Sequence, residues 1–135
     1  MKKLIPAILF VGVVLTLCAC SVTKQKTEKL RDIDFTVVGQ REIPEEFLEH
    51  IEEKEEYPLK MTYADEGILY IAVGYGEQET SGYSIEVNEL YETPNAIYIQ
   101  TNLIGPSADE KISKRKTYPY VVVKMEYLEK NVVFK

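Results

Sequence analysis

ILYIAVGYGEQETSGYSIEV, residues 68–87, is the stretch that decides the fold. Residues 68–73 form a continuous apolar and aromatic run, which is typical of a central strand covered on both faces. Tyr83, Ile85 and Val87 then alternate with polar residues, the pattern of a half-buried strand. Two strands follow each other with no helical pattern between them, which predicts a mostly β domain.

The segment between these two strands is a candidate hairpin or a candidate binding loop. Gly74 and Gly76 permit backbone conformations that other residues avoid, and Thr80-Ser81-Gly82 suits a turn before Tyr83. The composition favours a bulged hairpin, and a loop that binds a partner remains the alternative.

Strand patterns continue on both sides of this stretch. Short alternating apolar segments, separated by glycine, proline or asparagine turns, occur at residues 33–37, 59–63, 97–103, 121–125 and 132–134. Together with the first two they give seven strands. We therefore predict an antiparallel β-sandwich or a barrel-like sheet of about seven strands.

One helix is expected at residues 43–58. Pro44 suits the first turn, and Phe47, Leu48 and Ile51 share one face. Glutamates crowd the C-terminal half, where negative charge opposes the helix dipole. The helix should therefore be short and should depend on packing of its apolar face.

The first twenty residues, MKKLIPAILFVGVVLTLCAC, have the pattern of an export signal. A basic start precedes an apolar run that ends at Leu17 and is shorter than the roughly 20 residues of a membrane-spanning helix. Leu17-Cys18-Ala19-Cys20 resembles the lipobox of bacterial lipoproteins. That resemblance implies that residues 1–19 are a signal peptide and that Cys20 is lipidated; a signal cleaved elsewhere is the alternative.

Cleavage before Cys20 would leave a lipidated cysteine with a flexible polar tether at residues 20–32, followed by a β domain at residues 33–135. The soluble part would then contain no disulfide and no catalytic thiol. The formal net charge of −6 becomes more negative when Lys2 and Lys3 are removed, which argues against nucleic-acid binding. We expect an exported, membrane-anchored, extracytoplasmic bacterial protein whose contact with the membrane is the lipid.

The sequence offers no catalytic constellation. His50 is the one histidine and lies among glutamates, which favours a solvated side chain over a general base. The spacings of a nucleophile elbow, a phosphate-binding loop, a zinc motif and a calcium loop do not occur. We predict that the protein is not an enzyme and that it uses no metal, cofactor or small-molecule substrate.

A second loop stands out within residues 103–125. It begins at Gly105-Pro106, ends at Thr117-Tyr118-Pro119-Tyr120, and carries a basic run between them: Lys111, Lys114, Arg115 and Lys116. Tyrosines beside cations are typical of protein-binding surfaces, and an ordinary solvated loop is the alternative.

Both loops and their strands resemble the C-terminal domain of the PrcB family of protease-complex lipoproteins. The segments that carry the resemblance are IAVGYGEQETSGYSIEV, AIYIQTNLIGP and KTYPYVVVKM. Ser81 stands where the family has a glycine in its T-G-G-Y-like turn. The resemblance implies a non-catalytic, lipid-anchored protein that binds and stabilises a secreted subtilisin-like serine protease at the cell surface.

The family motifs single out six positions as contacts with the partner or as fold determinants. They are Thr80, Gly82, Tyr83, Thr117, Pro119 and Tyr120. A threonine and a glycine that shape a turn, and a Pro-Tyr that starts a strand, favour the fold role.

Two alternative functions remain open. ETSGY and KTYPY faintly resemble the loop motifs of chagasin-like inhibitors of papain-type proteases, although the first lacks the family's asparagine and proline and the second lacks its tryptophan. Two loops at one end of a sandwich would also suit a general extracellular recognition module.

Overall fold

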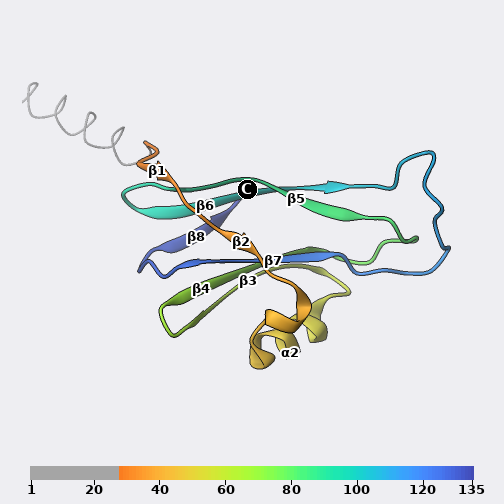
Figure 1. Ribbon diagram of the computed structural model, residues 1–135, viewed down its shortest axis with the longest axis horizontal. Helices are drawn as coiled ribbons and strands as arrows, with labels where there is room; N and C mark the ends of the chain where they lie inside the picture. The colour runs from red at the N-terminus through yellow and green to blue at the C-terminus, as the bar shows by residue number, and fades with distance from the viewer. Residues whose placement is uncertain (1–27) are drawn as a thin grey trace, which may run out of the picture.

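The computed structural model describes residues 28–135, which form two four-stranded sheets packed face to face with one helix on the outside (Figure 1). Sheet A has the strand order β1-β5-β6-β8, and sheet B has the order β2-β7-β4-β3. The predicted class, a mostly β sandwich with one short helix, is confirmed. The elements are β1 (Arg31–Asp32), β2 (Thr36–Val37), η1 (Gln40–Glu42), α2 (Glu45–Lys54), β3 (Pro58–Asp65), β4 (Ile68–Tyr75), β5 (Ser84–Glu92), β6 (Ala96–Ile104), β7 (Tyr120–Glu126) and β8 (Asn131–Phe134).

β4 is the central strand that its apolar run predicts. It pairs with β3 on one side and with β7 on the other, and most of its residues are buried. The β3–β4 hairpin turns at Glu66 and Gly67, which have φ angles of 47° and 80°. Positive φ at both central residues is the geometry of a tight turn whose twist matches that of the strands.

Two apolar clusters hold the layers together. The first lies between the sheets and includes the fully buried Ile71, Ile97 and Val123. The second lies between sheet B and α2, where Phe47 and Ile51 pack against Leu59 and neighbouring residues. Sheet B is therefore covered on both faces, which explains why β4 has no polar alternation.

The helix is shorter than the predicted range of 43–58. Pro44 precedes it as the N-cap, and the Pro44 carbonyl accepts the first helical hydrogen bond from the Leu48 N–H at 2.9 Å. The chain leaves the helical conformation before Tyr57, because a residue that precedes proline is disfavoured in that conformation. Phe47 and Ile51 are buried and Leu48 is half-buried, as the predicted apolar face requires.

The single strand predicted at residues 33–37 is wrong, because the chain changes sheets within it. β1 pairs with β5 in sheet A, whereas β2 pairs with β7 in sheet B. Ile33 is buried in the core, but Phe35 and Val37 are 37% and 56% exposed. The first strand also begins at Arg31, within the end of the segment predicted as a tether.

One strand pair departs from the antiparallel expectation. β8 runs parallel to β6, with Asn131 opposite Ala96 and Phe134 opposite Ile99. The other strand pairings within each sheet are antiparallel. β8 forms one edge of sheet A and places Phe134 against the core between the sheets.

A charged cluster joins three segments at the end of β5. The Glu92 carboxylate accepts hydrogen bonds from Arg31 Nε at 2.8 Å and from Lys130 Nζ, which also donates to the Thr93 carbonyl at 2.9 Å. Lys130 is the main cause and Arg31 a further cause of a pKa of Glu92 below the ordinary carboxyl value. The cluster connects β1, β5 and the turn before β8.

We expect this cluster to make the stability of the protein dependent on acid pH. Because the pKa of Glu92 is lowered on folding, its contribution is present at pH values above about 4.5 and is lost as the pH falls below that range. The difference in urea midpoint between wild type and Glu92→Gln should therefore be larger at pH 7 than at pH 3.

The matched control is Glu89→Gln, since Glu89 is an exposed carboxylate on the same strand with no ion pair in residues 28–135. Equal differences at the two pH values for Glu92→Gln would contradict the prediction.

Candidate functional site

Two loops lie side by side at one end of the sandwich, at the right of Figure 1. Residues 76–83 connect β4 to β5, and residues 105–119 connect β6 to β7; we call the pair the two-loop lobe. Gln78 and Thr117 form an isolated antiparallel bridge, with backbone hydrogen bonds of 2.8 and 3.0 Å. The bridge makes the two loops a single unit.

Small polar residues add three more links between the loops. The Thr117 hydroxyl donates to the Thr80 carbonyl at 2.7 Å. The Ser81 N–H donates to the Ser113 carbonyl at 3.1 Å, and the Ser113 N–H donates to the Ser81 hydroxyl oxygen at 2.8 Å. Ser81, which departs from the family pattern, thus has a defined role in this chain.

The bulged hairpin predicted at residues 74–87 is wrong. β4 belongs to sheet B and β5 belongs to sheet A, so the segment between them crosses from one sheet to the other. A local sequence pattern marks the end of a strand but does not determine which sheet the next strand joins. The crossing brings the first loop against the second.

Gly82 is required by its backbone and by its neighbours. Its φ angle is 93°, in the left-handed region. A Cβ atom there would lie 2.7 Å from the Pro106 Cβ and 2.5 Å from Glu110 Oε2. The second loop therefore packs directly on the Gly82 backbone.

The remaining predicted residues lie where the lobe meets the sheets. The half-buried Tyr83 ring lies beside Gly105, and the Pro119 carbonyl accepts a hydrogen bond from the Tyr75 N–H at 3.2 Å. Tyr120 begins β7 and packs against the cluster under α2, where burial, with smaller effects of Glu55 and Glu52, raises its pKa.

The six predicted positions thus fall into two groups. Thr80, Gly82 and Thr117 lie together inside the lobe and Tyr83 lies at its base, whereas Pro119 and Tyr120 lead into sheet B. Each of the six has a packing or hydrogen-bonding contact within the domain. Their contact with a partner remains a prediction.

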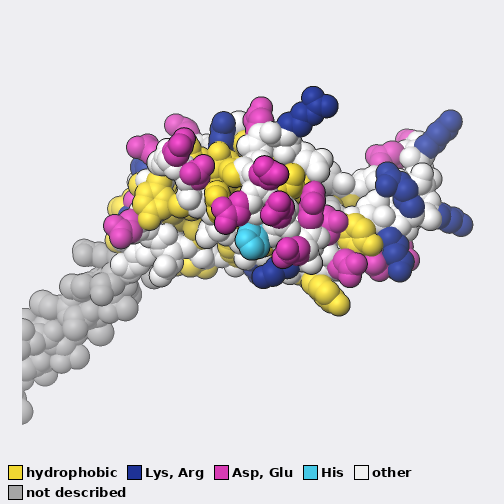
Figure 2. Space-filling view, turned by 90° about the horizontal axis from the view of Figure 1, so that it is seen from below, with side chains coloured by type: hydrophobic (Ala, Val, Ile, Leu, Met, Phe, Trp, Pro, Cys, Tyr) yellow, Lys and Arg dark blue, Asp and Glu magenta, His cyan; other side chains and the backbone are white. Residues whose placement is uncertain are grey.

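Basic and apolar side chains are exposed on the second loop. Lys111, Lys114 and Arg115 make no ion pair in residues 28–135, whereas Lys116 lies 3.5 Å from Glu77 Oε2. Ile112 is 44% exposed between them. Figure 2 shows Lys and Arg side chains gathered at the right-hand end, with some Asp and Glu side chains beside them, while Asp and Glu crowd the face around the single histidine.

His50 is exposed on α2, and its Nδ1 lies 4.0 Å from the i+3 carboxylate of Glu53. Within residues 28–135 no group of three or more histidines, cysteines or carboxylates could hold a metal ion. No helix in that range is both long and apolar enough for a membrane span.

Sequence patterns miss Gln78 and Ser113, two residues that hold the lobe together, and the contact that Ser81 makes with Ser113. The Gln78–Thr117 and Ser81–Ser113 contacts join residues more than thirty positions apart, so no local periodicity marks them. The one sequence feature that points to the lobe is the presence of two turn-rich loops in a chain that otherwise consists of plain strands.

The comparison with protein families identifies the part of the chain that builds the lobe. Residues 69–126 match the family described as PrcB C-terminal. The match begins in β4, ends with β7, and includes both loops of the lobe. The chain has no significant match among curated proteins or among solved structures.

Proposed function

Since residues 69–126 are a PrcB C-terminal domain, we propose that this protein is a non-catalytic subunit that binds and stabilises a secreted serine protease at the cell surface. The family implies association with a protease complex and is not known as catalytic. The serine protease, the stabilising effect and the surface location are the parts that we add.

The observation that carries the proposal is the coincidence of the family match with the two-loop lobe. Loop residues on a rigid β scaffold are common sites of recognition. Here the exposed cations and Ile112 lie on a protein whose formal net charge is −6. A partner surface with carboxylates around an apolar spot would complement this end of the molecule.

Lys114 and Arg115 allow a direct test of the lobe. We expect Lys114→Glu/Arg115→Glu to reduce recovery of the protease about tenfold, because charge reversal places like charges across the interface. The full chain carries a C-terminal tag and is crosslinked in intact cells, and the recovered protease is quantified.

The matched control is Arg41→Glu/Lys54→Glu, which makes the same charge change at exposed cations outside the lobe. Equal recovery with both double variants, at unchanged melting temperature, would exclude the lobe as the contact. Recovery of a papain-like protease that the purified chain inhibits would replace the proposal with the chagasin-like alternative.

We also propose that Cys20 anchors the chain to the membrane through lipid. Residues 1–27, which include the predicted signal peptide, Cys20 and most of the predicted tether, lie outside the described residues. The proposal rests on the lipobox-like sequence Leu17-Cys18-Ala19-Cys20. At least two acyl chains would give stable anchoring, whereas a single one binds only marginally.

Cys20→Ala is expected to abolish incorporation of labelled palmitate and to leave an unprocessed precursor, because the modified thiol is absent. Electrophoretic mobility and autoradiography measure both effects. Cys18→Ala is the matched control and should be labelled and processed normally, since alanine suits that lipobox position. Normal labelling of Cys20→Ala would refute the anchor.

A further inference from the structure

β6 has a free edge along its C-terminal half. β5 pairs with β6 from Ile97 to Ile104, but β8 covers the opposite edge only from Ala96 to Ile99. Past that point, no strand of residues 28–135 pairs with the second edge. Unpaired edge groups can accept another extended chain.

The alternation of the backbone shows which groups are free. The Lys135 N–H donates to the Ile99 carbonyl at 2.8 Å, so Ile99 directs its backbone groups to the β8 side. Backbone groups of successive residues in a strand point to opposite sides, so Thr101 and Leu103 direct their N–H and C=O groups to the same side as Ile99. These two residues form an open hydrogen-bonding ladder.

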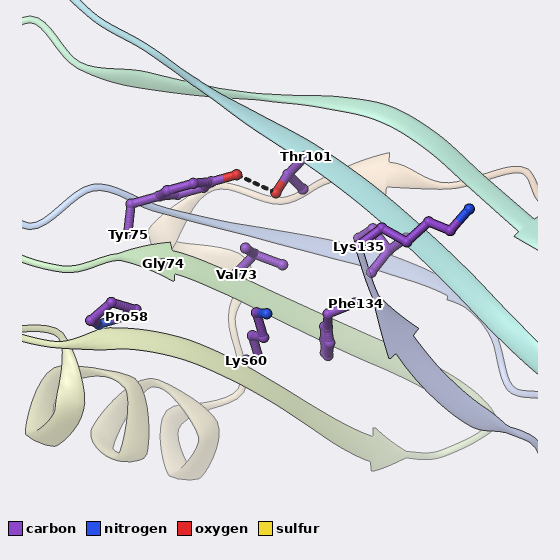
Figure 3. A pocket seen from close by; sticks show the side chains of 9 residues that line it. Pro58, Lys60, Val73, Gly74, Tyr75, Thr101, Phe134 and Lys135 are labelled. Carbon is purple, nitrogen blue, oxygen red and sulfur yellow. Dashed lines mark hydrogen bonds between the residues drawn. The ribbon is translucent and has the colours of Figure 1, made fainter.

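A cavity of about 270 Å³ lies beside this ladder (Figure 3). Val73, Ile99 and Phe134 supply much of its apolar wall, and the Tyr75 hydroxyl lies 2.7 Å from Thr101 Oγ1 at one end. The volume is below the range of about 300–1,000 Å³ typical of small-molecule pockets. It is sufficient for one bulky apolar side chain.

Lys60 gives the rim of the cavity a positive charge. It lines the cavity from β3, is exposed, and makes no ion pair in residues 28–135. Lys135 also lines the cavity, but its ammonium is directed away, 3.1 Å from the Tyr91 hydroxyl (Figure 3). The charge of Lys60 therefore favours an acidic residue two positions from the apolar side chain, where both side chains lie on the same face of an added strand.

We propose that an extended segment of a protein partner adds as a strand to β6 at Thr101 and Leu103. One bulky apolar side chain of the segment fills the cavity, and an acidic residue two positions away, on the same face of the added strand, lies near Lys60. Main-chain hydrogen bonds provide affinity in this mode of recognition, and the side-chain pocket provides selectivity. We call this site the strand slot.

The strand slot is continuous with the two-loop lobe, because β6 runs directly into the loop at residues 105–119. A partner bound to the lobe could therefore place an extended segment along β6. The strand slot rests on the proposed function only in that its occupant belongs to a protein, and it can be tested without the protease.

The test uses the purified full-length chain and a fluorescein-labelled octapeptide of valine and threonine with a central Phe-Thr-Asp segment, which places phenylalanine and aspartate on one face. Amide hydrogen exchange is measured by NMR at saturating peptide. The amides of Thr101 and Leu103 should exchange about tenfold more slowly, since each becomes a hydrogen-bonded strand amide. Amides on the outer edge of β3 should be unchanged.

Matched peptides separate strand addition from nonspecific adsorption. N-methylation of the central backbone amides, or alanine in place of phenylalanine, should each weaken binding about tenfold. Equal binding of the N-methylated peptide, protection at β3 instead of β6, or no protection at all would overturn the strand slot. Protection without peptide that rises with protein concentration would assign the edge to a second copy of the chain and would also overturn it.

Two variants of the protein complete the test. Thr101→Phe should fill the cavity and abolish peptide binding, and the exposed Lys60→Glu should prefer a probe with lysine in place of aspartate. Because Thr101→Phe could fail to fold, Lys60→Glu keeps the proposal testable: an unchanged preference would refute the predicted acidic residue near Lys60.

The lobe variant Lys114→Glu/Arg115→Glu distinguishes the two proposals. It should bind the peptide normally, because its substitutions lie in the lobe and not in the strand slot. For the wild-type chain, normal peptide binding without protease capture in cells would refute the protease proposal alone. Capture of the protease without peptide-induced protection would refute the strand slot alone.

Discussion

Phe47→Ala is expected to lower the free energy of unfolding by about 3–5 kcal/mol, the range for loss of a fully buried phenylalanine. Phe47 is 1% exposed, and its ring stacks on Tyr63 with a centroid separation of 5.3 Å. The Tyr70 ring lies at 6.5 Å. Alanine would leave a void between α2 and sheet B that these tyrosines cannot fill without moving.

The measurement is urea unfolding of wild type, Phe47→Ala and the control Leu48→Ala. Leu48 is half-buried on the same helix, so its truncation removes less apolar contact and should cost about 1 kcal/mol. A loss below about 1 kcal/mol for Phe47→Ala would mean that α2 is not held by the cluster described above.

Gly82→Ala is expected to destabilise the protein by about 3 kcal/mol and to separate the two loops. The left-handed conformation costs an alanine about 1–2 kcal/mol. Contact with the rigid Pro106 ring adds an overpacking cost of about 1–3 kcal/mol. Displacement of the second loop should break the Ser81–Ser113 and Thr80–Thr117 hydrogen bonds, and the Ser81 and Ser113 amides should then exchange faster.

Gly67→Ala is the matched control, because Gly67 has a φ of 80° but open space within 4 Å of the position that a Cβ atom would take. Gly67→Ala places an alanine in a left-handed conformation but adds no steric contact. Its destabilisation should therefore be about 1–2 kcal/mol. Equal destabilisation by the two variants would show that packing on Pro106 contributes nothing. Protease capture should fall with Gly82→Ala and stay normal with Gly67→Ala.

Elements that depend on local chemistry are predictable from the sequence. The apolar run at residues 68–73 identifies the central strand, and Glu66-Gly67 forms a glycine turn between it and the strand predicted at residues 59–63. The motif residues Thr80, Gly82 and Thr117 stand out in the sequence and lie within one lobe.

Elements that depend on distant pairing are not predictable in this way. The alternation of Ile33, Phe35 and Val37 suggests one strand, yet the chain passes from sheet A to sheet B within it. The pairing of Gln78 with Thr117 depends on two crossings between the sheets, and no spacing in either loop encodes it.

The end of α2, in contrast, has a local signal in the sequence. Tyr57 precedes Pro58, and proline disfavours the helical conformation in the residue before it.

The position of β1 has a mechanical consequence. β1 pairs with the last residues of β5, so the described chain enters at the end of the sandwich opposite the two-loop lobe (Figure 1). If the membrane holds the start of the chain and a partner holds the lobe, tension acts lengthwise along the strands. Lengthwise tension loads the hydrogen bonds between β1 and β5 and the Arg31–Glu92 pair together, so they resist as a set rather than opening one after another.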